Sequence, residues 1–227
     1  MNLDVVKKFK GRNSQPYTID ANENYLVVGY DDWSGSVDVH SRNDLDQNGM
    51  YQKITVSNFF SGGYKFDFYQ EYENRRSLIY RVIIANDTVY FCADDFALES
   101  WSIPNKEFKY EVRNIDYAYD IVIGREGTPL ANKMVSIGER SCLISNQETG
   151  AKVKKINFHT DCYSIAVDKA QTMIAVGTEM NVTFIETTNF TKVNEVSLND
   201  VFSLAFNKRD DCMLALLGNG EVYSFKF

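Results

Sequence analysis

The stretch IAVGTEMNVTFIETTNFTKVNEVSL, from Ile174 to Leu198, decides the fold of this chain. An apolar run rich in β-branched residues reaches Gly177, a polar turn follows, and a second such run ends before the Thr-Thr-Asn turn at 187–189. A third run of alternating character closes the stretch. Short strands separated by turn residues predict an antiparallel sheet.

The same pattern recurs along the whole chain, with a glycine or alanine closing the second strand of each unit. These marker residues are Gly29, Ala93, Gly138, Gly177 and Gly218. The last three intervals between markers are 45, 39 and 41 residues, whereas the first is 64. A unit copied at a period of about 40 residues is typical of one four-stranded blade of a β-propeller.

Each marker is followed by a polar turn and a third strand, and usually by a fourth strand. The third strands are SVDVHS, ALESWSI, SCLISN, NVTFIE and EVYSFKF, and the fourth strands are YQKITVS, EFKYEVR, KVKKINF and KVNEVSL. The chain is therefore predicted to be all-β, a β-propeller of four-stranded antiparallel blades. About five blades are expected, at 13–58, 77–113, 114–157, 158–197 and 198–227.

One N-terminal segment has no blade of its own: LDVVKKF, Leu3 to Phe9. Because the last unit lacks a fourth strand, we expect this segment to pair with EVYSFKF and to close the ring, which would cover an open sheet edge. Residues 1–227 are then a single domain, with 59–76 as an inserted aromatic loop. A sixth blade remains open if the segment Asn58 to Ser77 supplies strands instead.

The residues resemble the WD40-repeat β-propellers. Phe158 to Asp168, FHTDCYSIAVD, is similar to that family's motif of a Gly-His pair, an acid and an inner strand, and Leu198 to Asn207, LNDVFSLAFN, repeats it without the histidine. The resemblance implies a structural, blade-bonding role for His159. The Trp-Asp pair of the family is replaced by His40-Ser41, Ile185-Glu186 and Phe225-Lys226, which implies divergent blades held mainly by apolar packing.

Composition excludes several classes of function. A formal net charge of −7 disfavours binding to nucleic acid by neutralisation of phosphates. The N-terminus lacks a signal-peptide core and no segment approaches about 20 apolar residues, so a cytoplasmic protein is expected, with the nucleus open and no membrane partner. Four separated cysteines, Cys92, Cys142, Cys162 and Cys212, form no CxxC pair and are expected to be reduced and buried.

The chain offers little material for catalysis. It has two histidines, His40 and His159, so a Ser-His-Asp triad or a histidine-rich metal site is not expected. The sequence GREGTP at Gly124–Pro129 lacks the lysine of a phosphate-binding loop. No catalytic residue, cofactor, metal or small-molecule substrate is therefore predicted.

Acidic residues follow the markers in the turns between second and third strands. They are Asp31, Asp32, Asp94, Asp95, Glu139 and Glu179. One acid per turn is typical of turn hydrogen bonding, so the second acid of each pair is the candidate for a contact surface. The predicted partner-binding residues are Asp31, Asp32, Trp33, Arg75, Arg76, Asp94, Asp95 and Phe96, and the acids favour a partner with a basic segment.

The function predicted from the sequence is a non-catalytic protein-interaction scaffold or adaptor subunit of a larger intracellular complex. The alternative is a propeller enzyme, a hydrolase or lyase, with a carboxylate or calcium site in the central channel. Carboxylates converging on the channel would favour the enzyme. Lipid recognition is a third class and would depend on the pair Arg75-Arg76.

Overall fold

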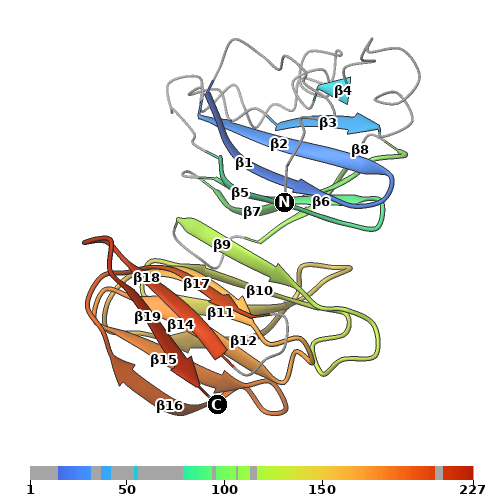
Figure 1. Ribbon diagram of the computed structural model, residues 1–227. Helices are drawn as coiled ribbons and strands as arrows, with labels where there is room; N and C mark the ends of the chain where they lie inside the picture. Colours follow the sequence, from blue (N-terminus) through green and yellow to red (C-terminus); the bar gives the residue numbers. More distant parts are fainter. Residues whose placement is uncertain are drawn as a thin grey trace.

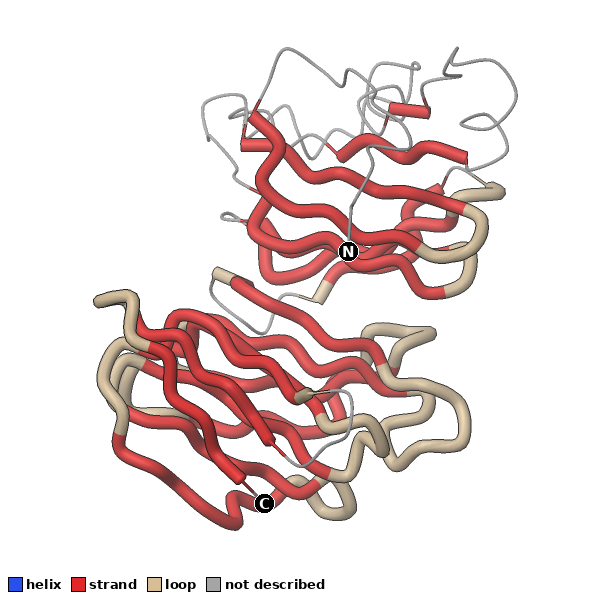
Figure 2. Tube along the Cα trace, in the orientation of Figure 1, coloured by secondary structure: helices blue, strands red, loops and turns tan. Residues whose placement is uncertain are grey.

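The computed structural model of the chain describes residues 15–31, 37–41, 54–55, 79–93, 96–105, 107–112, 117–207 and 212–226. Every regular element among them is a β-strand, and the strands form five antiparallel sheets, here called blades 1 to 5 (Figures 1 and 2). Each blade is a meander in which strands adjacent in sequence pair with one another. This arrangement confirms the predicted all-β class and the order of the repeated units.

Blade 1 contains β1 (Gln15–Ala21), β2 (Tyr25–Asp31), β3 (Val37–Ser41) and β4 (Ile54–Thr55). Blade 2 contains β5 (Ile79–Ala85), β6 (Thr88–Ala93), β7 (Phe96–Ser102) and β8 (Glu107–Glu111). Blade 3 contains β9 (Ala118–Ile123), β10 (Lys133–Gly138), β11 (Ser141–Asn146) and β12 (Lys152–Asn157). Blade 4 contains β13 (Cys162–Val167), β14 (Met173–Thr178), β15 (Asn181–Glu186) and β16 (Thr191–Ser197), and blade 5 contains β17 (Val201–Phe206), β18 (Cys212–Leu217) and β19 (Val222–Lys226).

The first strand of each blade contacts the first strand of the next, in the series β1, β5, β9, β13 and β17. These five are called the inner strands. The blades therefore follow one another around a common line of inner strands, with their outer strands directed away from it (Figure 1). The segment Leu3–Phe9 and the loop 59–76, which were predicted to close the ring and to form an insertion, lie outside the described residues.

Buried apolar side chains form four clusters, and each cluster lies between two neighbouring blades. Blade 1 packs on blade 2 through Val27 and Val82, and blade 2 packs on blade 3 through Leu98 and Ile121. Similar clusters join blade 3 to blade 4 and blade 4 to blade 5. Because each blade has two apolar faces, stability depends on stacking, as it does in other repeat architectures.

Two of the marker glycines, Gly177 and Gly29, have a steric cause. A Cβ atom on Gly177 would lie 2.6 Å from Cγ1 of Val201 on blade 5, and one on Gly29 would lie 2.7 Å from Cγ2 of Ile79 on blade 2. The inner strand of the following blade approaches the end of the second strand so closely that no side chain fits there. This contact explains two of the five markers. At the same position of the register, blades 2, 3 and 5 have the side chains of Cys92, Ile137 and Leu216.

The predicted structural role of His159 is wrong. His159 is exposed, whereas the preceding residue, Phe158, is buried between blades 3 and 4 and has the Lys192 ammonium 3.9 Å from its ring centroid. The bulky Phe158 occupies the place where the family has glycine, so the apolar ring anchors this junction. His40, in contrast, is buried in β3 at the predicted strand position.

Replacing Gly177 with alanine is expected to destabilise the fold by about 1–3 kcal/mol, because the new methyl group overlaps Val201 in a packed core. Denaturant unfolding monitored by circular dichroism measures this change.

The matched control is Val201→Ala, alone and combined with Gly177→Ala. Removing Cγ1 makes room for the added methyl, so the double variant should lose less stability than the two single variants together. Strictly additive losses would contradict the proposed overlap.

Candidate functional site

An aromatic residue occupies the same position in all five inner strands. These residues are Tyr17, Tyr80, Tyr119, Tyr163 and Phe202, and together they are called the inner aromatic row. Three of them are well exposed: Tyr17 at 57%, Tyr163 at 37% and Phe202 at 65% of full accessibility. Tyr80 and Tyr119, between them, are half-buried. Aromatic side chains that reach the surface at successive repeats form a patch that core packing does not require.

A β-bulge produces this position in each blade. The pairing register shifts between Pro16 and Thr18, and Tyr17 is the unpaired residue between them. The inner strands of the other four blades skip Tyr80, Tyr119, Tyr163 and Phe202 in the same way. Because the extra residue of a bulge has no partner across the ladder, the bulge redirects its side chain out of the alternating pattern.

Neighbouring rings of the row touch one another. The ring centroids are 6.5 Å apart for Tyr17 and Tyr80, 5.2 Å for Tyr80 and Tyr119, and 6.3 Å for Tyr119 and Tyr163. The first two pairs meet edge to face, which is the favourable geometry for aromatic contacts. The row therefore crosses four blades without a break and is held in place by its own contacts.

Acidic groups gather at the Tyr163 end of the row. Partial burial raises the pKa of the Tyr163 hydroxyl, and the negative charges of Asp161, Glu179 and Asp200 raise it further. The three acids are connected through the backbone, because Glu179 N–H donates to the Asp161 carbonyl and Asp200 N–H donates to the Glu179 carbonyl. Asp161 also lies 3.6 Å from Arg140 in an exposed ion pair.

At three of the four blade junctions, the residue directly after the bulged aromatic accepts a hydrogen bond from the next blade. Thr18 Oγ1 accepts a hydrogen bond from Val82 N–H at 3.3 Å, and Ser164 Oγ accepts one from Leu204 N–H at 3.0 Å. The carboxylate of Asp120 accepts one from Ile165 N–H at 3.2 Å. Hydrogen bonds between successive inner strands therefore lie directly beside the inner aromatic row.

The junction of blades 2 and 3 is built differently. Its corresponding residue is Arg81, which cannot accept a hydrogen bond and instead lies 3.4 Å from the carboxylate of Asp120. Asp120 also accepts a bond from its neighbour Ile121 N–H. Burial raises the pKa of Asp120, while Arg81 and the two backbone N–H groups oppose this shift.

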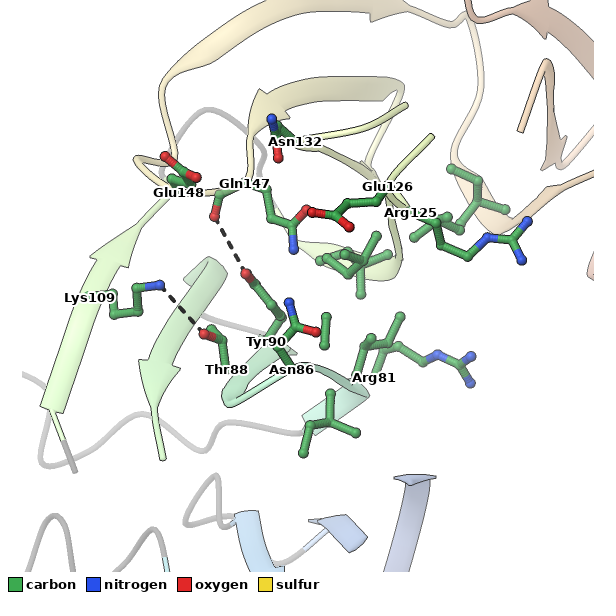
Figure 3. A pocket seen from close by; sticks show the side chains of 18 of the residues that line it. Arg81, Asn86, Thr88, Tyr90, Lys109, Arg125, Glu126, Asn132, Gln147 and Glu148 are labelled. Carbon is green, nitrogen blue, oxygen red and sulfur yellow. Dashed lines mark hydrogen bonds between the residues drawn. The ribbon is translucent and has the colours of Figure 1, made fainter. Parts of the chain in front are cut away.

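A cleft of about 840 Å³ lies at this same junction (Figure 3). Its lining includes Arg81, Lys109, Arg125, Glu126, Gln147 and Glu148. The charges are of both signs, and the arginines are engaged, Arg81 with Asp120 and Arg125 with the carbonyl oxygen of Lys169. Figure 3 shows Lys109 directed to Thr88 and the Tyr90 hydroxyl to the Gln147 carbonyl. The cleft thus does not concentrate one charge for a particular ligand.

Most of the contact residues predicted from the sequence cannot be placed. Asp31 ends β2 and Phe96 begins β7. Asp32, Trp33, Arg75, Arg76, Asp94 and Asp95 lie outside the described residues. The β1–β2 and β5–β6 registers pair Gln15 with Asp31 and Ile79 with Ala93, so these turns begin on the same face as the bulged aromatics.

The inner aromatic row was missed because the repeat analysis followed the second strand of each unit. The signal is present in the inner strands as PYTI, IYRV, AYDI, CYSI and VFSL. In an ordinary strand these aromatics would alternate with core residues and would be assigned to the core. The bulge turns their side chains out of the core.

The other reactive side chains are engaged in packing. Cys92, Cys142 and Cys162 are buried free thiols, as predicted, whereas Cys212 is only half-buried. Burial raises the pKa of the three buried thiols, that of Cys162 to about 12. Within the described ranges, no three His, Cys, Asp or Glu side chains come close enough to hold a metal ion. In the same part of the chain, no helix is long and apolar enough to cross a bilayer.

Searches by sequence identify no relative: no family model and no curated protein matches this chain. Solved structures do match. One is the crystal structure of the computationally designed Ika8 protein, at 15% identity and a TM-score of 0.72, covering 96% of this chain and 60% of the other. Another is a chain in a crystal structure of the mitotic checkpoint complex, at 12% identity and a TM-score of 0.76, covering 98% and 64%.

These likenesses establish the fold class as an all-β array of successive antiparallel, propeller-like blades. The chain spans about three fifths of the length of the solved chains that it matches. At identities of 12% and 15%, the shared feature is the fold alone.

Proposed function

We propose that this protein is a non-catalytic protein-interaction scaffold of the divergent WD40 type, an adaptor subunit of an intracellular complex. The inner aromatic row carries this proposal. Aromatic side chains dominate the energies of protein interfaces, and here they are exposed on strands fixed by bonds between blades. A rigid aromatic surface docks a partner without the cost of ordering a loop.

Two further observations support a scaffold. The solved mitotic checkpoint complex, of which one chain shares this fold, is a multi-protein assembly. The half-buried carboxylate of Asp120, near the middle of the row, accepts two backbone hydrogen bonds and pairs with Arg81. A carboxylate with these partners stabilises the junction, whereas the enzyme alternative needs carboxylates directed at a substrate or ion.

The contact residues predicted from the sequence remain part of this proposal. Asp31 ends β2 and Phe96 begins β7, at the edge where the bulged aromatics lie. We propose that Asp32, Trp33, Arg75, Arg76, Asp94 and Asp95, which lie outside the described residues, belong to the same contact surface. A partner lying across this face would meet the aromatic row first and the acidic turns at its margin. We propose the cytoplasm as the site of action, with the nucleus as the alternative.

The scaffold proposal predicts that the double variant Tyr163→Ser/Phe202→Ser loses the partners that co-purify with the wild-type protein from its native cell. Both side chains are exposed, so the fold should survive, which circular dichroism checks. The control is Val193→Ser, because Val193 is an exposed apolar residue on the outer strand of blade 4. Recovery of the same partners by the double variant and the wild type would contradict the proposal.

We also propose that the ring closes by pairing of Leu3–Phe9 with β19. Two observations support this closure. Within the described residues, blade 5 has three strands where the other blades have four. Its face away from blade 4 exposes Leu214 at 42%, whereas the corresponding residue of blade 4, Ala175, is fully buried.

Deletion of residues 1–10 should then lower the melting temperature of the whole protein, because an apolar sheet edge and face would be uncovered. Differential scanning calorimetry measures this effect. A control deletion within the loop 59–76 should leave the melting temperature closer to that of the wild type. Unchanged melting after removal of residues 1–10 would show that this segment does not close the ring.

A further inference from the structure

We infer that the inner aromatic row binds an extended peptide segment that carries a lysine or arginine, and that this cationic side chain lies against Tyr163. The inference rests on the proposed scaffold function and names the chemistry of the partner. Three observations carry it: the spacing of the rings, their exposure, and the position of the acidic groups.

The spacing of the rings fits an extended chain. Successive ring centroids from Tyr17 to Tyr163 are 6.5, 5.2 and 6.3 Å apart. In an extended peptide, every second side chain points to the same side, at a spacing of about 6.6 Å. Alternate side chains of one bound segment can therefore meet successive rings.

The acidic groups select the charge of the segment. Backbone hydrogen bonds hold Asp161, Glu179 and Asp200 together, and all three carboxylates act electrostatically on Tyr163. Arg140 offsets one of these three charges, so the group keeps an excess of negative charge, and the chain as a whole carries a net charge of −7. A cation against the face of a tyrosine ring gains from the ring quadrupole, and the nearby carboxylates add attraction at this end of the row. An acidic segment would be repelled there.

The middle of the row has no excess negative charge to attract a second cation. Arg81 follows Tyr80 directly on β5. Its side chain lies 3.4 Å from the carboxylate of Asp120, the residue after Tyr119 on β9. Its charge is compensated by Asp120, so this part of the row is neutral overall. We therefore assign the cationic side chain to the position facing Tyr163 and apolar or aromatic side chains to the positions facing Tyr119 and Tyr80.

The test uses the full-length protein and an immobilised library of nine-residue peptides in which alternate positions are varied over all amino acids. Lysine and arginine should be enriched at one position, and apolar or aromatic residues at the positions two and four residues away. Tyr163→Ala should weaken binding of the enriched peptides by about tenfold, and Tyr163→Phe should retain most of it, because the ring face is kept.

A variant with neutral side chains at the three acids near Tyr163 separates attraction by these acids from attraction by the net charge of the protein. Asp161→Asn/Glu179→Gln/Asp200→Asn should abolish the preference for lysine and arginine. The control Asp87→Asn/Glu126→Gln/Glu148→Gln removes the same charge from turns at the opposite ends of the strands, and should keep the preference. Raising the salt concentration should weaken the binding of cationic peptides and leave the binding of neutral peptides nearly unchanged.

Several outcomes would overturn the inference. They are no enriched position, enrichment without lysine or arginine, and equal loss of the preference in both charge variants. Failure here is distinguishable from failure of the scaffold proposal, because co-purification of native partners through Tyr163 and Phe202 does not depend on their charge. A row that captures partners yet binds neutral peptides equally well would refute only the assignment of the cation.

Discussion

The fold depends on a constraint at the inner strands. Each inner strand pairs with one neighbour inside its own blade, so some of its backbone N–H groups face away from that sheet and need another acceptor. The preceding blade supplies one through a side chain, Thr18, Asp120 or Ser164. Since these bonds join residues of different blades, they fix the relative position of neighbours more narrowly than apolar packing alone.

The same layer positions the inner aromatic row. The residue after each bulge faces the neighbouring blade, so the bulged residue itself is left exposed and is repeated at blade spacing. At the junction of blades 2 and 3, Arg81 replaces the small acceptor, and the cleft lined by Arg81 and Asp120 lies there. There, a long charged side chain holds the blades together by an ion pair in place of a side-chain acceptor.

Much of the fold was predictable from the sequence, because its signals are local. Strand lengths and turns follow from the backbone, and two of the marker glycines follow from close approach, as Gly177 against Val201 shows. The site was not predictable in the same way. A bulge depends on the pairing register between two strands, and periodicity alone assigns Tyr119 or Tyr163 to the core. The prediction for His159 was wrong for a related reason. The apolar ring of Phe158 takes the buried position, and the histidine side chain is exposed.

Amide hydrogen exchange at single-residue resolution tests the bonds between inner strands most directly. The N–H groups of Val82, Ile165 and Leu204 each donate a hydrogen bond to a side chain of the preceding blade. They should exchange as slowly as the ladder amides of β14, whereas exposed turn amides such as that of Glu148 should exchange quickly. Rapid exchange at these three positions, with β14 still protected, would contradict an array of blades locked through its inner strands.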